Sequence, residues 1–190
     1  MEQYDYNIPI YDRNLAFTDL ETTGPEWWKH EVLEFGAVIT TPDLHVLHEI
    51  DAKVRPEHIE NADAFALEYN GYSDEAWQDA VDLHDVLEEY CDHSSNAVLA
   101  GHNPQFDKTF IEKALIDRKM PMHQLDSHSV DTYTMGHLVL RYSNIKKMNM
   151  DNISKAIGIM PEPMPHRAIN GARQALKIYA TMMHIKQSLN

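Results

Sequence analysis

The chain has 190 residues, with 30 acidic side chains against 16 basic ones and a formal net charge of −14 at pH 7. This balance argues against a protein that coats polyanions through a broadly basic surface. No apolar run approaches the roughly 18–20 residues that span a bilayer, and residues 1–13 carry neither the basic nor the apolar segment of a signal peptide.

The first half of the sequence predicts three strands and two helices. Short apolar runs bounded by turn residues predict strands at residues 14–20, 32–40 and 44–54. The turn residues 41–43 indicate that the second and third strands form a hairpin. Apolar side chains at helical spacing predict helices at residues 63–69 and 74–90.

The second half alternates strands and helices. The elements expected there are a buried strand at residues 97–100, a helix beginning at Pro104, a weaker strand at 129–132, helices at 135–141 and 149–158, and a long final helix from His166 to about residue 188. This order predicts a mixed α/β sheet in one domain, residues 13–190, with residues 1–12 as an N-terminal extension.

The charge is unevenly distributed along the chain. Residues 1–140 hold 28 acids and 8 bases, whereas residues 141–190 hold 2 acids and 8 bases. The densest acidic stretch, residues 56–107, has thirteen acids and no Lys or Arg. We interpret this stretch as a solvated helical face, with a docking site for a basic partner as the alternative.

Two carboxylates mark the end of the first predicted strand. In the segment FTDLETTG, residues 17–24, Asp19 and Glu21 are two positions apart, so both side chains leave the same face of the strand. Neighbouring carboxylates repel each other unless a cation neutralises them, and hard divalent ions prefer oxygen ligands. Surface strands also carry such pairs, but this one ends an apolar strand and precedes Thr-Thr-Gly.

Two further segments carry candidate groups. Asp107, in GHNPQFD, lies just inside a helix that follows a buried strand, at the edge where α/β proteins place their sites. His166, in MPHRAINGARQALKIY, follows a proline-rich connection at a helix start. Taken alone, each has an ordinary structural explanation, because acids are favoured in the first turn of a helix and this is one of twelve histidines.

Together the three segments resemble the DEDDh family of 3′–5′ exonucleases, the DnaQ-like or RNase T-like group on the ribonuclease H-like fold. FTDLETTG is similar to the first motif of that family, GHNPQFD to the second, and HRAINGARQALKIY to the third. The resemblance spans about residues 13–182. It implies a ribonuclease H-like mixed five-stranded sheet flanked by helices in a single domain.

The resemblance also implies roles for individual residues. Asp19, Glu21 and Asp107 match the acids that hold a pair of divalent ions, Mg²⁺ or Mn²⁺, and His166 matches the general base. The substrate-binding positions that it implies are Leu20, Thr22, Thr23, Phe65, Leu67, Tyr69, His102, Asn103, Phe106 and Arg167. For Phe65 and Leu67, packing in the core is an equally good explanation.

The third motif departs from the family at one position. The family has an aspartate five positions after the histidine, and here that position is Gly171. The nearest polar neighbour is Asn170, and no carboxylate lies nearby in the sequence. Glycine inside a helix costs about 1 kcal/mol relative to alanine, so helix propensity does not explain it. A water molecule in that space would complete a coordination shell without adding charge, so we expect weaker metal binding or reduced activity.

The leading hypothesis is a metal-dependent 3′–5′ exonuclease that hydrolyses phosphodiester bonds at single-stranded DNA or RNA 3′ ends and releases nucleoside 5′-monophosphates. One alternative is a catalytically lapsed module that binds nucleic acid or a protein partner on the same fold. A second is a proofreading subunit of a polymerase. The candidates for phosphate contacts are Arg141, Lys146, Lys147, Arg167 and Arg173.

The expected partners are single-stranded nucleic acid 3′ ends, with no membrane. Small relatives in this family are frequently homodimers, and the sequence carries no interface signature that tests this. The single cysteine, Cys91, excludes an internal disulfide, so we expect a reducing, cytoplasmic compartment.

Overall fold

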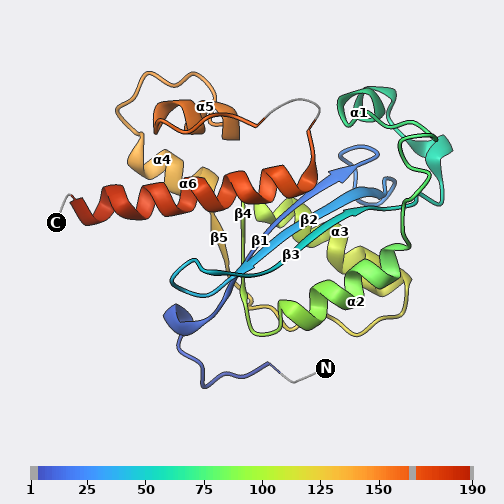
Figure 1. Cartoon of the computed structure of the whole chain (residues 1–190), viewed down its shortest axis with the longest axis horizontal. Helices are drawn as coiled ribbons and strands as arrows, with labels where there is room; N and C mark the ends of the chain where they lie inside the picture. The colour runs from blue at the N-terminus through green and yellow to red at the C-terminus, as the bar shows by residue number, and fades with distance from the viewer. Residues whose placement is uncertain (1–3, 163–165, 189–190) are drawn as a thin grey trace.

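Five strands form one mixed sheet in the order β3-β2-β1-β4-β5 (Figure 1). The structure, a computed structural model, describes residues 4–162 and 166–188. The strands are β1 (Leu15–Thr22), β2 (Val32–Thr40), β3 (Val46–Lys53), β4 (Val98–Gly101) and β5 (Ser129–Asp131). β2 pairs antiparallel with both β1 and β3, whereas β4 pairs parallel with both β1 and β5. The sheet is therefore the mixed five-stranded sheet that the motif resemblance implied.

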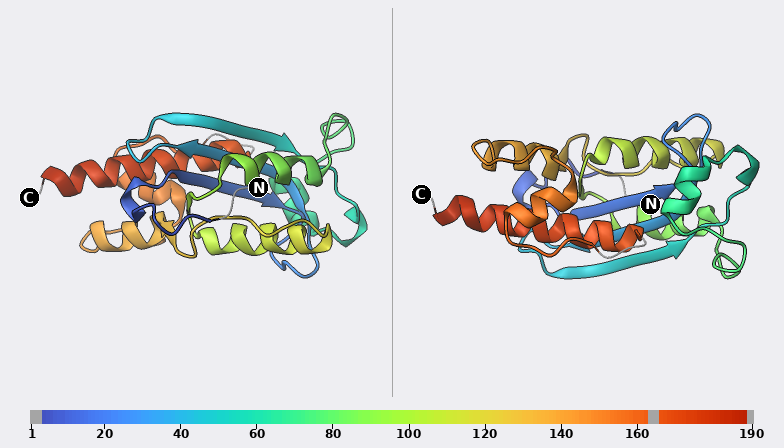
Figure 2. Two further views of the ribbon diagram at one scale, coloured as in Figure 1. Left: turned by 90° about the horizontal axis from the view of Figure 1, so that it is seen from below. Right: turned by 90° about the horizontal axis from the view of Figure 1, so that it is seen from above.

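Helices cover both faces of this sheet (Figure 2). They are α1 (Ala64–Tyr69), α2 (Leu83–His93), α3 (Pro104–Asp117), α4 (Thr132–Val139), α5 (Met150–Ala156) and α6 (Ala168–Ser188), with short 3-10 turns at Ile10–Asp12 and Ile59–Asn61. α2 and α3 pack on one face, and α6 lies along the other with α4 and α5 outside it. The result is a three-layer α/β/α domain.

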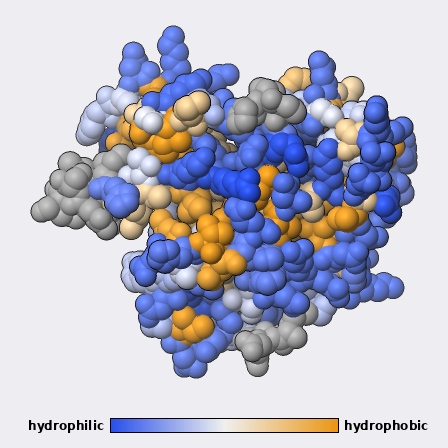
Figure 3. All heavy atoms as spheres, in the orientation of Figure 1, coloured by the Kyte–Doolittle hydropathy of each residue, from blue (hydrophilic) through white to orange (hydrophobic). Residues whose placement is uncertain are grey.

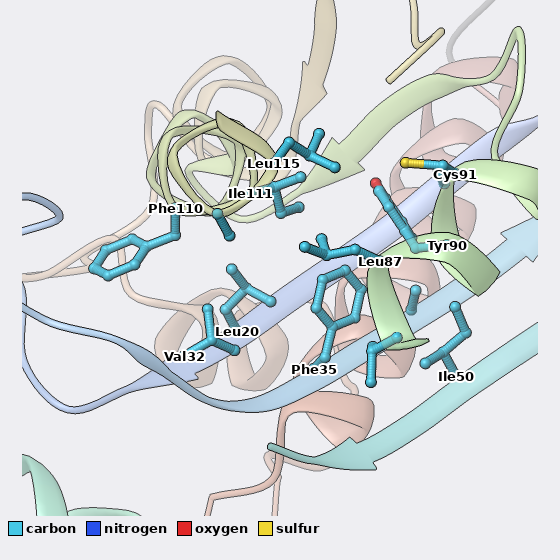
Figure 4. Packing of buried hydrophobic residues seen from close by; sticks show 14 of the residues in the cluster. Leu20, Val32, Phe35, Ile50, Leu87, Tyr90, Cys91, Phe110, Ile111 and Leu115 are labelled. Atoms are coloured by element: carbon cyan, nitrogen blue, oxygen red, sulfur yellow. The ribbon is translucent and has the colours of Figure 1, made fainter. Parts of the chain in front are cut away.

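The larger core lies between the sheet and helices α2 and α3 (Figure 4). All nine residues of β2 are buried, as expected of a strand that lies inside the sheet and is covered on both faces. The ring of Phe35 on β2 packs edge-on against that of Tyr90 on α2, with 5.0 Å between their centroids. The Tyr90 hydroxyl lies 3.0 Å from Thr18 Oγ1, so this buried polar group has a partner.

On the opposite face, α6 begins in direct contact with the strand backbone. A Cβ built on Gly36 of β2 would overlap the backbone of Ala168 and Ile169, so only glycine permits this approach. Phe17 of β1 packs below Ala172 and Ala175 of the same helix. The first two turns of α6 are thus fixed against the centre of the sheet, near the C-terminal end of β1.

The predicted elements are all present, but one helix is shorter than expected. Residues 74–90 were expected to be helical, whereas α2 begins at Leu83 and residues 74–79 form turns. Val81 instead makes a parallel bridge with Val54, and the Trp77 indole N–H donates to the carbonyl oxygen of Leu33. Asp82 then caps α2 by accepting from a backbone N–H. Trp77 and Ala80 of the apolar pattern pack against Leu33 of β2 outside any helix, whereas Val81 is exposed.

Two helix starts also differ from expectation. Thr132 was placed in the fifth strand, but it begins α4 because Asp131 caps that helix. His166 was expected to open the final helix, which begins instead at Ala168. His166 therefore lies two residues before α6, where its direction is not set by helix geometry.

The residues expected to form an N-terminal extension are partly attached to the domain. Residues 1–3 lie outside the described part, and the Tyr4 hydroxyl hydrogen-bonds Asp126 while Asp5 N–H donates to Asn96 Oδ1. The division at residue 12 stays a prediction.

The surface in Figure 3 is mostly hydrophilic, with hydrophobic atoms in separate patches. Among the described residues no helix has the length and apolar character needed to cross a bilayer.

We predict that Gly36→Ala destabilises the fold by about 3 kcal/mol or more, because the added methyl would overlap backbone atoms of α6 that cannot rotate away. The measurement is the free energy of unfolding in urea. Gly136→Ala on α4 is the matched control, because its Cβ would meet only movable side-chain ends, such as Ile153 Cδ1 at 2.9 Å. Equal effects of the two substitutions would contradict the close contact between α6 and β2.

Candidate active site

Asp19 and Glu21 lie on the face of β1 that α6 covers. Their alternation with Phe17, which packs under α6, places both carboxylates on the same side of the sheet. Both are partly buried, whereas most of β1 is fully buried. The two predicted acids therefore lie side by side at the C-terminal end of the strand.

Asp107 is brought to the same end of β1 by α3. β4 pairs with β1 only as far as Phe17, so the edge of β1 beyond that residue has no strand beside it. Asp107 Oδ1 accepts a hydrogen bond of 2.9 Å from the backbone N–H of Leu20 on that edge. The bond ties the first turn of α3 to the strand that carries Asp19.

The turn between β4 and α3 is held by the end of β5. Asn103 has a left-handed backbone, with φ 60° and ψ 51°, and Pro104 begins the helix. The Asn103 N–H donates to Asp131 Oδ1 at 3.0 Å, and His102 Nδ1 lies 3.1 Å from Thr132 Oγ1. Burial lowers the pKa of His102, which favours its neutral form.

His166 lies between an aromatic ring and a carboxylate. Its imidazole stacks on Tyr69, with centroids 4.5 Å apart and planes at 16°, and its Nδ1 lies 3.3 Å from Glu162 Oε2. The other Glu162 oxygen, Oε1, accepts from the Arg167 backbone N–H at 2.9 Å. Because Nδ1 faces Glu162, Nε2 is the nitrogen that points away from it and is the better placed to take a proton.

These groups surround one pocket. Its lining consists of Asp19, Leu20, Glu21, Tyr69, His102, Asn103, Phe106, Asp107, Asn149, Met150, Asp151, Glu162 and His166. Four of them were not predicted from the sequence: Asn149, Met150, Asp151 and Glu162. The sequence could have indicated two of these, because Asp151 and Glu162 are the two acids in the otherwise basic residues 141–190.

The carboxylates of the pocket raise one another's pKa. For Asp19 the main cause is burial, followed by the charges of Asp107 and Glu162. Burial is also the main cause at Glu21, where the pKa rises to about 9 with contributions from Asp19 and Glu162. Burial raises the pKa of Asp107 too, partly offset by the hydrogen bond from Leu20. A bound cation or proton therefore stabilises the folded chain by reducing the repulsion among these carboxylates.

Gly171 lies directly beside Asp19, and a water molecule in place of the missing aspartate stays a prediction. The sequence suggested that a water molecule could fill the position of the missing aspartate. A Cβ built on Gly171 would lie 2.7 Å from Asp19 Cγ and closer still to Asp19 Oδ2. The Asp19 carboxylate occupies the place of a Cβ at position 171, so a side chain there would require the Asp19 side chain to move.

The side chains of Thr22 and Thr23 make hydrogen bonds within the fold. Both side chains are buried: Thr22 Oγ1 donates to the Gly24 carbonyl oxygen at 2.8 Å, and Thr23 Oγ1 accepts from the Glu31 N–H at 2.9 Å. Neither residue lines the pocket, in contrast to Leu20. Their assignment to substrate binding stays a prediction.

The three candidates around α1 separate into two groups. Phe65 is 72% exposed and stacks on Tyr69, with 5.9 Å between the ring centroids. Leu67 packs instead against the cluster that contains Leu33 and Trp77. The ring series Phe65, Tyr69 and His166 therefore leads from the surface into the pocket.

Two basic residues proposed for phosphate contacts have acidic partners. Arg167 Nε lies 2.9 Å from Glu34 Oε2, and its Nη2 lies 2.9 Å from Asp51 Oδ1. Arg173 pairs in the same way with Glu49 at 3.0 Å. These contacts attach α6 to β2 and β3, and neither arginine lines the pocket. A phosphate role for either arginine stays a prediction.

The donor set of the pocket fits a divalent cation. It offers carboxylate oxygens from Asp19, Glu21, Asp107 and Glu162, which are the ligands that Mg²⁺ and Mn²⁺ prefer. Within residues 4–162 and 166–188, no three His, Cys, Asp or Glu side chains are already gathered as a complete metal-binding set. The carboxylates supply the charge, and a cation would have to draw them together.

We predict that without divalent cations the free energy of unfolding falls as pH rises from about 5 to 9. The Glu21 pKa rises from 4.5 to about 9 on folding, so the folded chain holds this proton more tightly and loses the advantage as the proton leaves. Glu21→Gln should show a smaller fall, and exposed Glu68→Gln should match the native chain. Identical pH profiles for Glu21→Gln and the native chain would contradict the raised pKa.

Known proteins were compared with the sequence and the fold. The RNase_T family model, described as "Exonuclease", matches residues 16–179. The DNA polymerase III PolC-type of Thermotoga petrophila is 21% identical over 184 residues, which cover 97% of this chain and 13% of that protein. The oligoribonuclease of Corynebacterium glutamicum is 29% identical over 138 residues, covering 65% of this chain and 63% of that protein.

Solved structures agree with the fold. E. coli exonuclease I in complex with a dT13 oligonucleotide matches with a TM-score of 0.75 at 14% identity, over 93% of this chain and 42% of that chain. A 3′-exonuclease solved for recognition of the histone mRNA stem-loop matches with a TM-score of 0.71 at 13% identity, over 94% and 67% of the two chains. The chain spans less than two thirds of each of the two sequence relatives. Because the family model covers most of its length, the chain belongs to the RNase_T exonuclease family.

Proposed function

We propose that the chain is a metal-dependent 3′–5′ exonuclease that acts on single-stranded DNA or RNA ends. The observation that carries this proposal is the pocket at the end of β1. Asp19, Glu21, Asp107 and His166 come from three distant parts of the sequence and line that one pocket. Exonuclease-family membership supplies the reaction class, and a module that only binds has no need for this combination of acids and a histidine.

The residues of the pocket divide the chemistry among them. Asp19, Glu21 and Asp107 would hold divalent cations, which when bound supply the charge that stabilises a phosphodiester undergoing hydrolysis. His166 Nε2 would take a proton from the attacking water, a task suited to a histidine near neutral pH. Glu162 holds Nδ1 at the opposite side of the ring and so fixes the orientation of the imidazole. The products are a nucleoside 5′-monophosphate and a strand shortened by one nucleotide.

The surroundings of the pocket suit a short single-stranded end. Phe65 and Tyr69 are exposed aromatic side chains that stack in series with His166, and single-strand sites hold bases by stacking on aromatic side chains. Asn149 and Met150 line the pocket just after the exposed, basic Lys146 and Lys147. With 28 acids in residues 1–140, the remaining surface disfavours a long, tightly held duplex.

A lapsed, noncatalytic module is the second candidate, and Gly171 is the observation that favours it. Its helix position carries no acid, so the site lacks a carboxylate from α6. A polymerase context is consistent with the PolC-type relatives, in which the matched region makes up a small part of a much longer protein.

We predict that a 5′-labelled single-stranded oligonucleotide is shortened stepwise from its 3′ end in Mg²⁺ or Mn²⁺ and is left intact in chelator. Asp19→Ala should remove the activity, and His166→Ala should lower kcat by about 10²–10⁴-fold. Exposed His45→Ala is the matched control for the histidine substitution. No shortening by the native chain in either metal, with clear shortening by Gly171→Asp, would support the lapsed module instead.

The lysine pair gives a separate prediction about binding. Lys146→Ala with Lys147→Ala should reduce the dependence of log Kd on log salt by about 1.4 for single strands, if each lysine neutralises one phosphate. Lys29→Ala with Lys177→Ala removes the same charge from exposed sites elsewhere and should leave the slope unchanged. The slope is measured by fluorescence anisotropy in Ca²⁺ or with Asp19→Ala. An unchanged slope in the first pair would remove these lysines from the substrate path.

A further inference from the structure

Glu162 is an acid of the pocket that the family motif does not include. Its side chain is only 7% exposed, although Glu162 lies outside any helix or strand. It lines the same pocket as Asp19, Glu21 and Asp107. A carboxylate is seldom buried without a partner of opposite charge. Its described partners are the Arg167 N–H and the ring of His166, which do not include a basic side chain with a permanent charge.

Gly171 cannot supply a ligand in this arrangement. Asp19 lies directly against the backbone of α6 at that point, where any Cβ would overlap its carboxylate. The Asp19 carboxylate thus occupies the place where an acidic side chain on α6 would begin. An acid introduced at position 171 would have to displace Asp19, which is itself a proposed cation ligand.

Glu162 is the acid best placed to make up the missing charge. It lines the pocket together with Asp19 and Glu21, and its side chain is almost completely buried there. Asp151 also lines the pocket, but it lies in the first turn of α5, where the helix N-terminus already favours a carboxylate. Glu162 and Asp151 are the two acids in residues 141–190, a segment with eight bases, and both are located at this pocket.

We propose that Glu162 is the fourth carboxylate of the cation site, supplied from the connection before His166 in place of a side chain at Gly171. The inference rests on the proposed function and names one more residue of the same site. Glu162 then has two roles: it holds His166 through Nδ1, and it completes the negative charge beside Asp19. The site retains four carboxylates, one of which comes from a different part of the chain.

The test is Mn²⁺ binding to the purified full chain without nucleic acid, measured by electron paramagnetic resonance of free Mn²⁺. Glu162→Gln should weaken Mn²⁺ binding tenfold or more, as should Asp19→Asn. Asp151→Asn is the matched control, because it neutralises another acid of the same pocket, and it should change the affinity less than threefold. His166→Ala removes the histidine partner of Glu162 and should leave the Mn²⁺ affinity within threefold of the native value.

Further variants keep the inference open to refutation. If Glu162→Gln fails to fold, Glu162→Asp keeps the charge on a shorter side chain and should weaken Mn²⁺ binding severalfold. Gly171→Asp should not bind Mn²⁺ more tightly than the native chain. Native affinity in a folded Glu162→Gln variant, or a tenfold gain in Gly171→Asp, would overturn the role of Glu162.

Oligonucleotide degradation distinguishes this result from failure of the proposed function. If the native chain binds Mn²⁺ and shortens a single-stranded oligonucleotide while Glu162→Gln binds Mn²⁺ equally well, only the inference about Glu162 fails. If the native chain neither binds Mn²⁺ nor shortens the oligonucleotide, the exonuclease proposal fails, and the role of Glu162 fails with it.

Discussion

The backbone contact between α6 and the sheet is the constraint on which the rest of the site depends. Gly36 allows the start of α6 to lie directly on β2, and Gly171 lies against the carboxylate of Asp19 one turn further along. This seating fixes where the chain enters the helix and therefore where His166 is held. It also places position 171 against the Asp19 carboxylate, so a side chain there would have to move Asp19. The departure from the family motif is thus coupled to how closely the helix packs.

The same packing gathers carboxylates in a buried part of the fold, where water screens their charges poorly. Asp19, Glu21 and Asp107 lie at the end of a buried strand, and Glu162 adds a fourth carboxylate to the same pocket. In the absence of a cation, burial and repulsion favour the protonated acids, which costs the folded state stability as pH rises. A cation-binding site commonly lowers the stability of the folded state when the cation is absent, because the charges that attract the cation repel one another. The acidic chain is therefore compatible with a phosphodiester substrate, provided that cations lie between the two.

Much of this could be predicted from the sequence, because it depends on local pattern. Asp19 and Glu21 end an apolar strand, and Asp107 begins a helix after another strand, so parallel-sheet topology brings them together. Glu162 escaped prediction because it lies in a connection without periodicity, and only the path of the chain brings it to the pocket. The expected helix at residues 74–90 was wrong in its first half because Trp77 packs against Leu33 of β2, and Val81 forms a backbone bridge with Val54 just after β3. The packing of Asp19 against Gly171 depends on the distance between two elements, which no sequence motif states.

A crystal structure of the full chain with Mn²⁺, with the metal located by anomalous scattering, tests the central claim most directly. The account predicts an anomalous peak coordinated by Asp19, with Glu162 turned toward a cation and α6 still in contact with β1 at Gly171. A peak coordinated by Asp19 and Glu21 alone, with Glu162 still bound only to Arg167 and His166, would contradict the fourth-carboxylate role. The absence of any peak in this pocket at saturating Mn²⁺ would contradict the cation site as a whole.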